Sequence, residues 1–364
     1  EIYTLSLHDA LPISSWNLKK YRIETKCVQS GYKAGSGEPQ VPPVVQSTTY
    51  RYYDGTDVAK LFDLQSDDFM YSRLGSPTVS FLEKKMAELE GGTAAVAASS
   101  GQSANLMAIL NICEAGDHII STSAIYGGTH NLFKVTLKKM GIDTTFVDPC
   151  ASEEELLKAA KPKTKLLFSE SLGNPTLTVT DFDKFRRASD KLGVPLMVDN
   201  TLASPYLCRP IEHGAHIVVH STTKYCDGHA TSVGGVVVES GTFPWDKYGK
   251  KYKGMTEPDD SYHGLKFYET FGDTAFSVKL RAQMLRDMGC TMSPMNAFLT
   301  LQGLDTLHLR MERHSENALK LAEYLESHPK VQWIRYPGLK KDPYHQLGKK
   351  YLPKGCSEIG RAHV

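Results

Sequence analysis

The sequence predicts an α/β fold: a mostly parallel sheet with helices on both faces, followed by a smaller C-terminal α+β domain. Between residues 78 and 238, short apolar runs alternate with segments of helical periodicity, which is the pattern of repeated βαβ units. The apolar runs are nearly continuous, as strands covered on both faces require. After about residue 275 the pattern changes to a long amphipathic helix, 305–327, and a strand, 331–336.

Local signals place the individual elements. The first helix, 78–90, is closed by Gly91-Gly92, and Gly141 ends the helix predicted over 129–140. The other helices of this region are expected over 102–113, 153–160 and 181–192. The strands are expected over 96–98, 118–121, 144–147, 165–169, 196–198, 217–219 and 236–238.

The chain divides into five segments. Residues 15–75 form an N-terminal arm rich in glycine and proline, 76–275 the α/β domain, and 276–356 the C-terminal domain. Residues 1–14 and 357–364 resemble translated sequencing-adapter sequence, so we expect them to be non-native. If so, the natural chain continues beyond about residue 356, and the C-terminal domain is truncated here.

The composition excludes several classes of function. The 364 residues carry a net charge of +1, so we expect no nucleic-acid partner and no binding to a membrane surface. No apolar stretch approaches the roughly 20 residues of a membrane-spanning helix. The seven cysteines are scattered and form no CxxC pair, which argues against disulfides and a metal site. This cysteine pattern favours the reducing cytoplasm.

Two residues at the ends of predicted strands point to a cofactor. Asp199 follows the apolar run 196–198, and Lys224 comes shortly after the run 217–219. Because ligands bind at the carboxyl ends of parallel strands, we expect both side chains at one edge of the sheet. A lysine and a carboxylate are the contacts that pyridoxal phosphate (PLP) requires, as Schiff-base partner and as partner of the pyridine nitrogen. Taken alone, Asp199 also fits a turn and Lys224 a surface lysine.

Other polar residues expected at this edge are candidates for holding a phosphate. The segment Ser100-Gly101-Gln102 lies where a strand meets a helix, and the free amides at a helix N-terminus bind anions. Ser221 and Thr223 offer hydroxyl groups beside Lys224. The two segments together predict a phosphate site, although a helix that starts with serine and glycine is common.

Four further side chains are weaker candidates. Tyr126 follows a strand and is able to stack on a planar ring, or to pack in a surface loop. Asn174 is a possible donor to the phenolate oxygen of the cofactor, or part of a plain Asn-Pro turn. Tyr71 and Arg73 lie in the arm, where we expect an extended segment with both side chains on one face. An arginine suits a phosphate, while a solvated strand is the alternative.

Motifs of other enzyme classes are mostly absent. The patterns HExxH, GxxxxGK[ST], GxSxG and GxGxxG do not occur. The segment Ser221-Thr222-Thr223-Lys224 matches the S-x-x-K of penicillin-binding acyl-enzymes, but the accompanying S-D-N and K-T-G motifs are missing. A four-residue pattern with two fixed positions is weak evidence, so the PLP hypothesis is favoured.

Taken together, these segments resemble the Cys/Met-metabolism PLP enzymes of fold type I, from about residue 20 to about residue 355. Three stretches, 204–215, 258–264 and 296–304, are similar to the O-acetylhomoserine sulfhydrylases of that family. The family resemblance rests on the motifs Tyr71-x-Arg73, Ser100-Gly101-Gln102, Tyr126-Gly127-Gly128-Thr129, Glu170-Ser171-x-x-Asn174-Pro175, Val198-Asp199-Asn200-Thr201 and Ser221-Thr222-Thr223-Lys224-Tyr225.

The resemblance implies a role for each site residue, with 76–275 as the PLP-binding domain. Lys224 forms the Schiff base and moves protons, Tyr71 is a second acid–base group, and Tyr126 stacks on the cofactor ring as a third catalytic residue. Asp199 pairs with the pyridine nitrogen and Asn174 contacts the cofactor. The phosphate is held by Ser100, Gly101, Gln102, Ser221 and Thr223, and by Tyr71 and Arg73 of a neighbouring subunit. The active site is then shared across a dimer, and two dimers form a homotetramer.

The activity implied by the resemblance is γ-replacement in methionine and cysteine biosynthesis (transsulfuration). Sulfide or a thiol replaces the acetate of O-acetyl-L-homoserine, which gives L-homocysteine when sulfide is used. Cystathionine γ-synthase, γ-lyase and methionine γ-lyase share the PLP contacts and remain alternatives. The family binds the substrate carboxylate with an arginine expected beyond the end of this chain, since Arg361 lies in the expected non-native tail. A truncated PLP-binding protein with little or no activity is therefore a second alternative.

Overall fold

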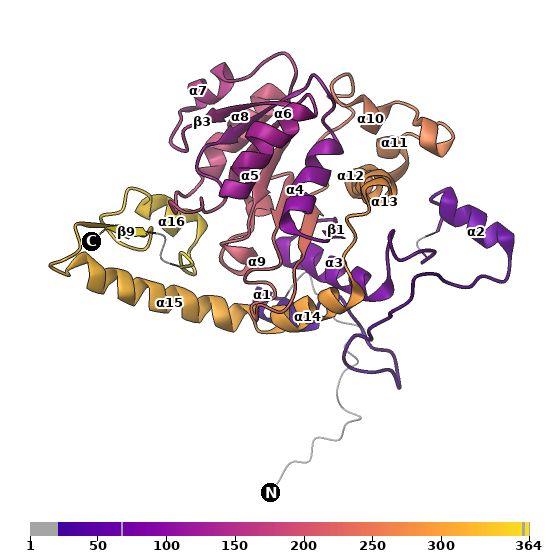
Figure 1. Ribbon diagram of the computed structural model, residues 1–364, viewed down its shortest axis with the longest axis horizontal. Helices are drawn as coiled ribbons and strands as arrows, with labels where there is room; N and C mark the ends of the chain where they lie inside the picture. The colour runs from indigo at the N-terminus through magenta and orange to yellow at the C-terminus, as the bar shows by residue number, and fades with distance from the viewer. Residues whose placement is uncertain (1–20, 67, 359–360, 364) are drawn as a thin grey trace, which may run out of the picture.

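A computed structural model describes residues 21–66, 68–358 and 361–363. The interpretation of residues 1–14 lies outside this part of the chain, as does the side chain of Arg361. The centre of the molecule is a sheet of seven strands in the order β1-β7-β6-β5-β4-β2-β3 (Figure 1). The strands are β1 (Ala94–Ala98), β2 (His118–Thr122), β3 (Asp143–Val147), β4 (Thr164–Glu170), β5 (Leu196–Asp199), β6 (Ile217–His220) and β7 (Gly235–Glu239).

The sheet is mostly parallel, which confirms the predicted fold class. Strands β3, β2, β4, β5 and β6 pair in parallel, as strands joined by helical crossover connections do. Strand β7 runs antiparallel to both β6 and β1. The carboxyl ends of β4, β5 and β6 therefore lie at one edge of the sheet, where Glu170 pairs in register with Asp199.

Each strand contributes to two hydrophobic cores, because successive side chains point to opposite faces. One core contains Ala97, Val198 and Val218, and the other contains their neighbours Val96, Met197 and Val219. The first core is covered by α1 (Ile23–Gln29), α3 (Pro77–Glu90), α7 (Glu153–Lys158), α8 (Phe182–Leu192), α9 (Ser204–Leu207), α14 (Pro294–Asp305) and α15 (Leu307–Glu326). The second is covered by α4 (Gly101–Leu110), α5 (Gly127–Asn131), α6 (Leu137–Lys139), α10 (Lys253–Thr256), α11 (Phe267–Phe271), α12 (Ala275–Lys279) and α13 (Arg286–Met288), or by segments next to them.

Helix α3 matches the predicted helix 78–90 and ends at Gly91, as predicted. The Ser76 hydroxyl accepts a hydrogen bond from the amide of Val79 at the N-terminus, and Pro77 occupies the first helical position. Gly91 ends the helix in the left-handed conformation, with φ of 78°. The helix predicted over 129–140 is less regular, since a π-helical turn at residues 132–136 separates α5 from α6.

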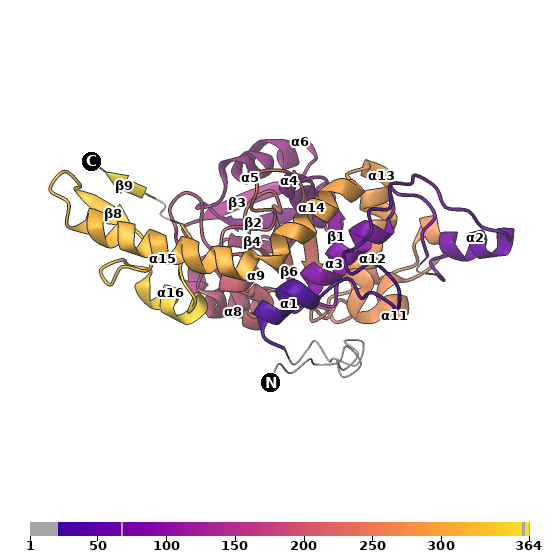
Figure 2. The same ribbon diagram turned by 90° about the horizontal axis from the view of Figure 1, so that it is seen from below.

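The remaining segments extend to both sides of the sheet domain. In Figures 1 and 2, α2 (Gly55–Phe62) of the arm lies at one end of the molecule, and α16 (His345–Tyr351) lies at the other. Beside α16, β8 (Trp333–Arg335) pairs antiparallel with β9 (Arg361–His363). The predicted helix 305–327 is α15, and α14, which the sequence did not reveal, precedes it. None of the described helices is long and apolar enough to cross a membrane.

Candidate active site

Loops from several strands enclose a cavity of about 240 Å³ at the carboxyl edge of the sheet. Its walls come from the segments that follow β1, β2, β4, β5 and β6. The cavity is lined by nine of the predicted site residues: Ser100, Gly101, Gln102, Tyr126, Asn174, Asp199, Ser221, Thr223 and Lys224. Residues separated by more than 100 positions in the sequence therefore meet at the carboxyl edge of the sheet. This is the edge at which their positions after predicted strands placed them.

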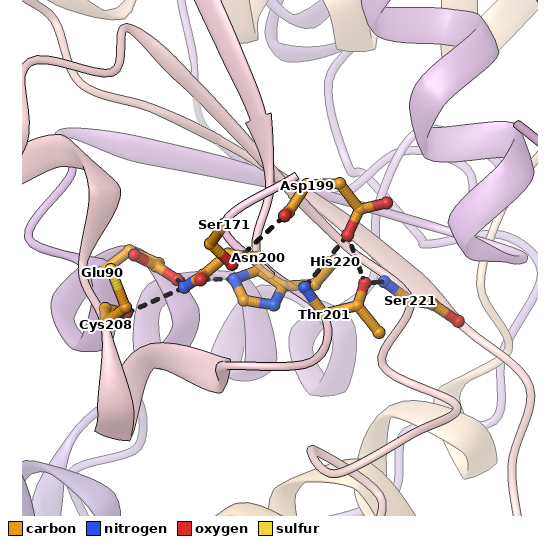
Figure 3. Close-up of polar contacts among 8 residues, drawn as sticks. All are labelled: Glu90, Ser171, Asp199, Asn200, Thr201, Cys208, His220 and Ser221. Carbon is orange, nitrogen blue, oxygen red and sulfur yellow. Dashed lines mark hydrogen bonds and ion pairs between the residues drawn. The ribbon is translucent and has the colours of Figure 1, made fainter. Parts of the chain in front are cut away.

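Asp199 is held at the end of β5 by the residue two positions later. Its Oδ1 accepts hydrogen bonds from the backbone amide and the hydroxyl of Thr201, at 3.0 and 2.5 Å. Figure 3 shows the other carboxylate oxygen pointing away from Thr201. The Thr201 hydroxyl also accepts from the backbone amide of Ser221, at 2.8 Å. This chain of contacts fixes the ends of β5 and β6 relative to each other.

The N-terminus of α4 and the segment after β6 meet in one corner of the cavity. Ser100 and Ser103 form a capping box, in which the backbone amide of each donates to the hydroxyl of the other. The backbone amides of Gly101 and Gln102 take no part in this capping box. A Cβ atom on Gly101 would lie 2.6 Å from the Cβ of Ser221, so only glycine permits this approach. Thr223 is fixed beside Ser221, because its hydroxyl exchanges hydrogen bonds with the backbone of Gly234.

Tyr126 and Asn174 are connected by Glu170 at the end of β4. The Glu170 carboxylate accepts from the amide of Tyr126 at 2.7 Å and from the amide of Asn174 at 3.0 Å. Its side chain is buried, and burial together with the charge of Asp199 raises its pKa well above the usual range, although the two amides act in the opposite direction. Tyr126 is 49% exposed and lines the cavity.

Lys224 lies in an irregular turn after β6, as predicted, and its side chain is exposed at the cavity. The turn is closed by hydrogen bonds from the Lys224 amide to the Ser221 carbonyl and from the Gly228 amide to the Lys224 carbonyl. Asp227 organises the following loop by accepting from the amides of His229 and Thr231. The Lys224 amine thus extends from a turn that is stabilised by hydrogen bonds, rather than from a helix.

A buried polar cluster lies on the other side of the same strand ends (Figure 3). The Nε2 of His220 lies 2.6 Å from Oε1 of Glu90, and both side chains are fully buried. Asn200 donates to the same oxygen at 2.7 Å and to the carbonyl of Cys208 at 2.9 Å. Asp199 therefore lines the cavity, while its neighbour Asn200 is hydrogen-bonded to α3. In the same way, Ser221 lines the cavity while its neighbour His220 contacts Glu90 of α3.

Tyr71 and Arg73 do not line this cavity. The expectation of an extended segment is wrong after Tyr71, which forms an isolated bridge with Thr49 and is followed by a turn closed by the Leu74 amide. The two side chains are nevertheless neighbours, since the Arg73 guanidinium lies 5.3 Å from the centre of the Tyr71 ring. The Arg73 guanidinium also donates to the carbonyl of Arg286.

The sequence interpretation missed Glu170, Thr201 and the Glu90–His220 pair as site residues. A signal for Glu170 was available, because it follows the predicted strand 165–169 as Asp199 follows the predicted strand 196–198. Thr201 has no such signal, since its role depends on a hydroxyl that bridges two strands. Glu90 is charged at the end of a helix, where an exposed position is the ordinary expectation.

The side chains present fit PLP. The corner at Gly101, which a Cβ atom would fill, joins a helix N-terminus to two hydroxyl groups and suits a phosphate. In the same cavity an amine, a carboxylate and an aromatic ring are available for the aldehyde, the pyridine nitrogen and the ring face. Fold and site together define a PLP-dependent enzyme of fold type I.

Comparisons with known proteins agree with this class. The chain belongs to the Cys/Met metabolism PLP-dependent enzyme family, whose sequence model matches residues 24–359. It is 49% identical over 346 residues to the O-acetyl-L-homoserine sulfhydrylase of Leptospira meyeri, covering 93% of this chain and 78% of that protein. It is also 49% identical over 321 residues to the homocysteine synthase of Schizosaccharomyces pombe, covering 87% and 74% of the two chains.

A solved structure is similar over nearly the whole chain. It is a putative O-acetylhomoserine (thiol)-lyase from Campylobacter jejuni, with a TM-score of 0.90 and 36% sequence identity. The match covers 94% of this chain and 84% of the other. That structure contains N'-pyridoxyl-lysine-5'-monophosphate, in which PLP is joined to a lysine. The fold and the cofactor predicted from the sequence are thereby confirmed.

Proposed function

We propose that this chain catalyses γ-replacement on O-acetyl-L-homoserine, with sulfide as the nucleophile and L-homocysteine and acetate as the products. The observation that carries the proposal is that Lys224, Asp199 and the Gly101 corner line one cavity. The reaction class is supported by the similarity to an O-acetyl-L-homoserine sulfhydrylase and a homocysteine synthase. This activity belongs to methionine and cysteine biosynthesis.

Each residue at the cavity has a defined task in this proposal. Bound PLP supplies an electron sink for negative charge that develops on the substrate. Lys224 holds the cofactor covalently at rest and afterwards moves protons between substrate carbons. Asp199, oriented by Thr201, stabilises a proton on the pyridine nitrogen.

The remaining residues hold and orient the cofactor. Tyr126 covers one face of the ring, and Asn174 donates to its phenolate oxygen. The amides of Gly101 and Gln102, together with the hydroxyls of Ser100, Ser221 and Thr223, bind the phosphate. A fixed phosphate and a covered ring keep the reacting carbon of the substrate within reach of the Lys224 amine.

Tyr71 and Arg73 are assigned to the active site of a neighbouring subunit. Their position outside the cavity of their own chain supports this assignment. The active site is then completed in a dimer, and two dimers form a homotetramer. The seven cysteines are all free thiols, which supports a reducing compartment such as the cytoplasm.

The test combines cofactor labelling with turnover. Purified protein is loaded with PLP, reduced with borohydride and digested, and we expect the pyridoxyl group on the peptide that contains Lys224. Lys224→Ala protein should retain no pyridoxyl group after reduction and dialysis, and its retention there would contradict the assignment. Absence of a visible absorption band in wild-type protein that has been loaded with PLP and then freed of unbound PLP would contradict the proposal as a whole.

The choice among related reactions is tested with different reactants. Sulfide should give homocysteine and acetate from O-acetyl-L-homoserine. Faster turnover with cysteine would favour cystathionine γ-synthase, while elimination from cystathionine or methionine would favour a γ-lyase. A protein that holds PLP without any turnover would favour the non-catalytic alternative.

A further inference from the structure

Glu170 connects two loops that both reach the cavity. One of its carboxylate oxygens accepts from the amide of Tyr126, in the loop that follows β2, and the other accepts from the amide of Asn174, in the loop that follows β4. Glu170 as a residue is 6% exposed, so water competes little for these bonds. A single side chain thus connects two loops. Tyr126 is 44 positions from Glu170 along the chain, and Asn174 is four positions from it.

The two loops are also packed closely against each other. A Cβ atom on Gly173 would lie 2.6 Å from the carbonyl oxygen of Ala124, so the backbone of one loop touches the other. A Cβ atom on Gly128 would lie 2.5 Å from the Tyr126 ring, which places that ring against its own loop. A shift of either amide away from Glu170 therefore moves a side chain that lines the cavity.

We propose that Glu170 is a positioning residue, whose carboxylate sets the placement of Tyr126 and Asn174 and thereby the orientation and retention of the bound cofactor. This inference rests on the proposed PLP site. Glu170 acts through the two amides and not through contact with the reacting atoms.

The chemistry of the side chain explains why a carboxylate stands at this position. A carboxyl group has acceptor lone pairs on both oxygens, whether ionised or protonated, whereas the glutamine amide has one acceptor oxygen and an NH2 group that only donates. Two backbone amides that point at the two oxygens can both be satisfied by the carboxyl group of glutamate, whereas glutamine would satisfy only one of them. The fold keeps this group although it is buried and paired in register with Asp199, which is an unfavourable place for a second negative charge.

The chain offers a matched control in Glu239. This residue is 3% exposed, and its carboxylate accepts from the amides of Phe276 and Ser277 at 3.1 and 2.8 Å. Because Glu239 pairs with Ile217, the first residue of β6, it lies at the opposite edge of the sheet from the cavity. Glu239→Gln therefore makes the same chemical change in the same kind of environment, away from the proposed site.

The experiment compares Glu170→Gln with Glu239→Gln in PLP-loaded protein. The first measurement is the visible circular dichroism per bound PLP, which reports how the ring is held. The second is the rate of PLP loss to a scavenger, and the third is hydrogen exchange in peptides covering 123–129 and 172–178. For Glu170→Gln we expect an altered dichroism band, PLP loss faster by about tenfold or more, and faster exchange in both peptides.

Glu239→Gln should lower the thermal midpoint but leave the dichroism band and the PLP release rate within about twofold of wild type. Equal dichroism and release rates for wild type and Glu170→Gln would overturn the inference while leaving the proposed function intact. Failure of the wild type to bind PLP would overturn both. If Glu170→Gln does not fold, the same criteria apply to Glu170→Asp, which keeps both acceptors on a shorter stem and should show a smaller change in the same direction.

Discussion

The phosphate corner gives the most direct test of the site, through the substitution Gly101→Ala. A Cβ atom at this position would lie 2.6 Å from the Cβ and 2.8 Å from the Cα of Ser221. Since carbon atoms pack at about 3.5 Å, the two segments would have to separate by about 0.9 Å. Part of the obstacle is backbone, so rotation of the Ser221 side chain alone would not relieve it.

The size of the effect follows from this displacement. A hydrogen bond of about 2.9 Å stretched by about 0.9 Å leaves the range in which it contributes. Loss of two bonds to a charged phosphate, at about 1.5–3 kcal/mol each, predicts at least a 100-fold weaker affinity for PLP, or about 3 kcal/mol.

The assay is a titration of apoprotein with PLP, followed by visible absorption and circular dichroism. Gly127→Ala is the control, because a Cβ atom at Gly127 meets nothing within 4 Å. Gly127 is also the first residue of α5, where alanine is well accommodated. We expect Gly127→Ala to bind PLP within about threefold of wild type. Wild-type affinity in Gly101→Ala would refute the assignment of the phosphate to this corner.

Three further predictions concern stability. Asn200→Ala removes donors to Glu90 and to a backbone carbonyl and should lower the unfolding free energy by about 2–4 kcal/mol in urea titrations; a loss below about 0.5 kcal/mol would contradict the buried cluster. Burial and the charge of Lys161 lower the pKa of His118 from 6.5 to about 4, so the unfolded chain binds the additional proton and stability falls as the pH drops between these values. We expect a loss of about 1–2 kcal/mol after solvent screening, and a His118→Gln variant should lack this part of the pH dependence. Burial raises the pKa of Glu239 from 4.5 to about 7, so its contribution to folding stability is present below pH 4.5 and is lost as the pH rises to 7. The stability of Glu239→Gln should therefore depend less on pH over this interval, and an unchanged slope would argue against the raised pKa.

The sequence predicted most of the sheet because parallel buried strands have a simple signature. Apolar runs such as 196–198 and 217–219 have few alternatives, and the polar residues that follow them must lie at one edge. This rule located Asp199, Lys224 and the Gly101 corner before any geometry was known. It works because the site residues follow directly from the ends of regular elements.

The same rule could not reveal contacts that depend on packing between distant segments. The contact between Glu90 and His220 requires the end of α3 to pack against the end of β6. No local sequence pattern predicts a contact between segments so far apart in the chain. The turn after Tyr71 was missed because the arm has no regular periodicity, and its conformation depends on contacts with Thr49 and with the carbonyl of Arg286. Helix α14 was missed because its hydrophobic residues are spread around the helix rather than along one face.

The ends of β5 and β6 send adjacent residues in opposite directions, one toward the cavity and the next toward α3. The length and register of these two strands are therefore as important as their composition. A one-residue deletion within β5 that shifted the exit would bring Asn200 to the cavity side and place Thr201 opposite Glu90. It would also bury Asp199 at the position of Val198 in the hydrophobic core, where a charge has no partner. We expect libraries of this chain to tolerate many point substitutions in β5 and almost no length changes, and the loops far from this edge should absorb insertions instead.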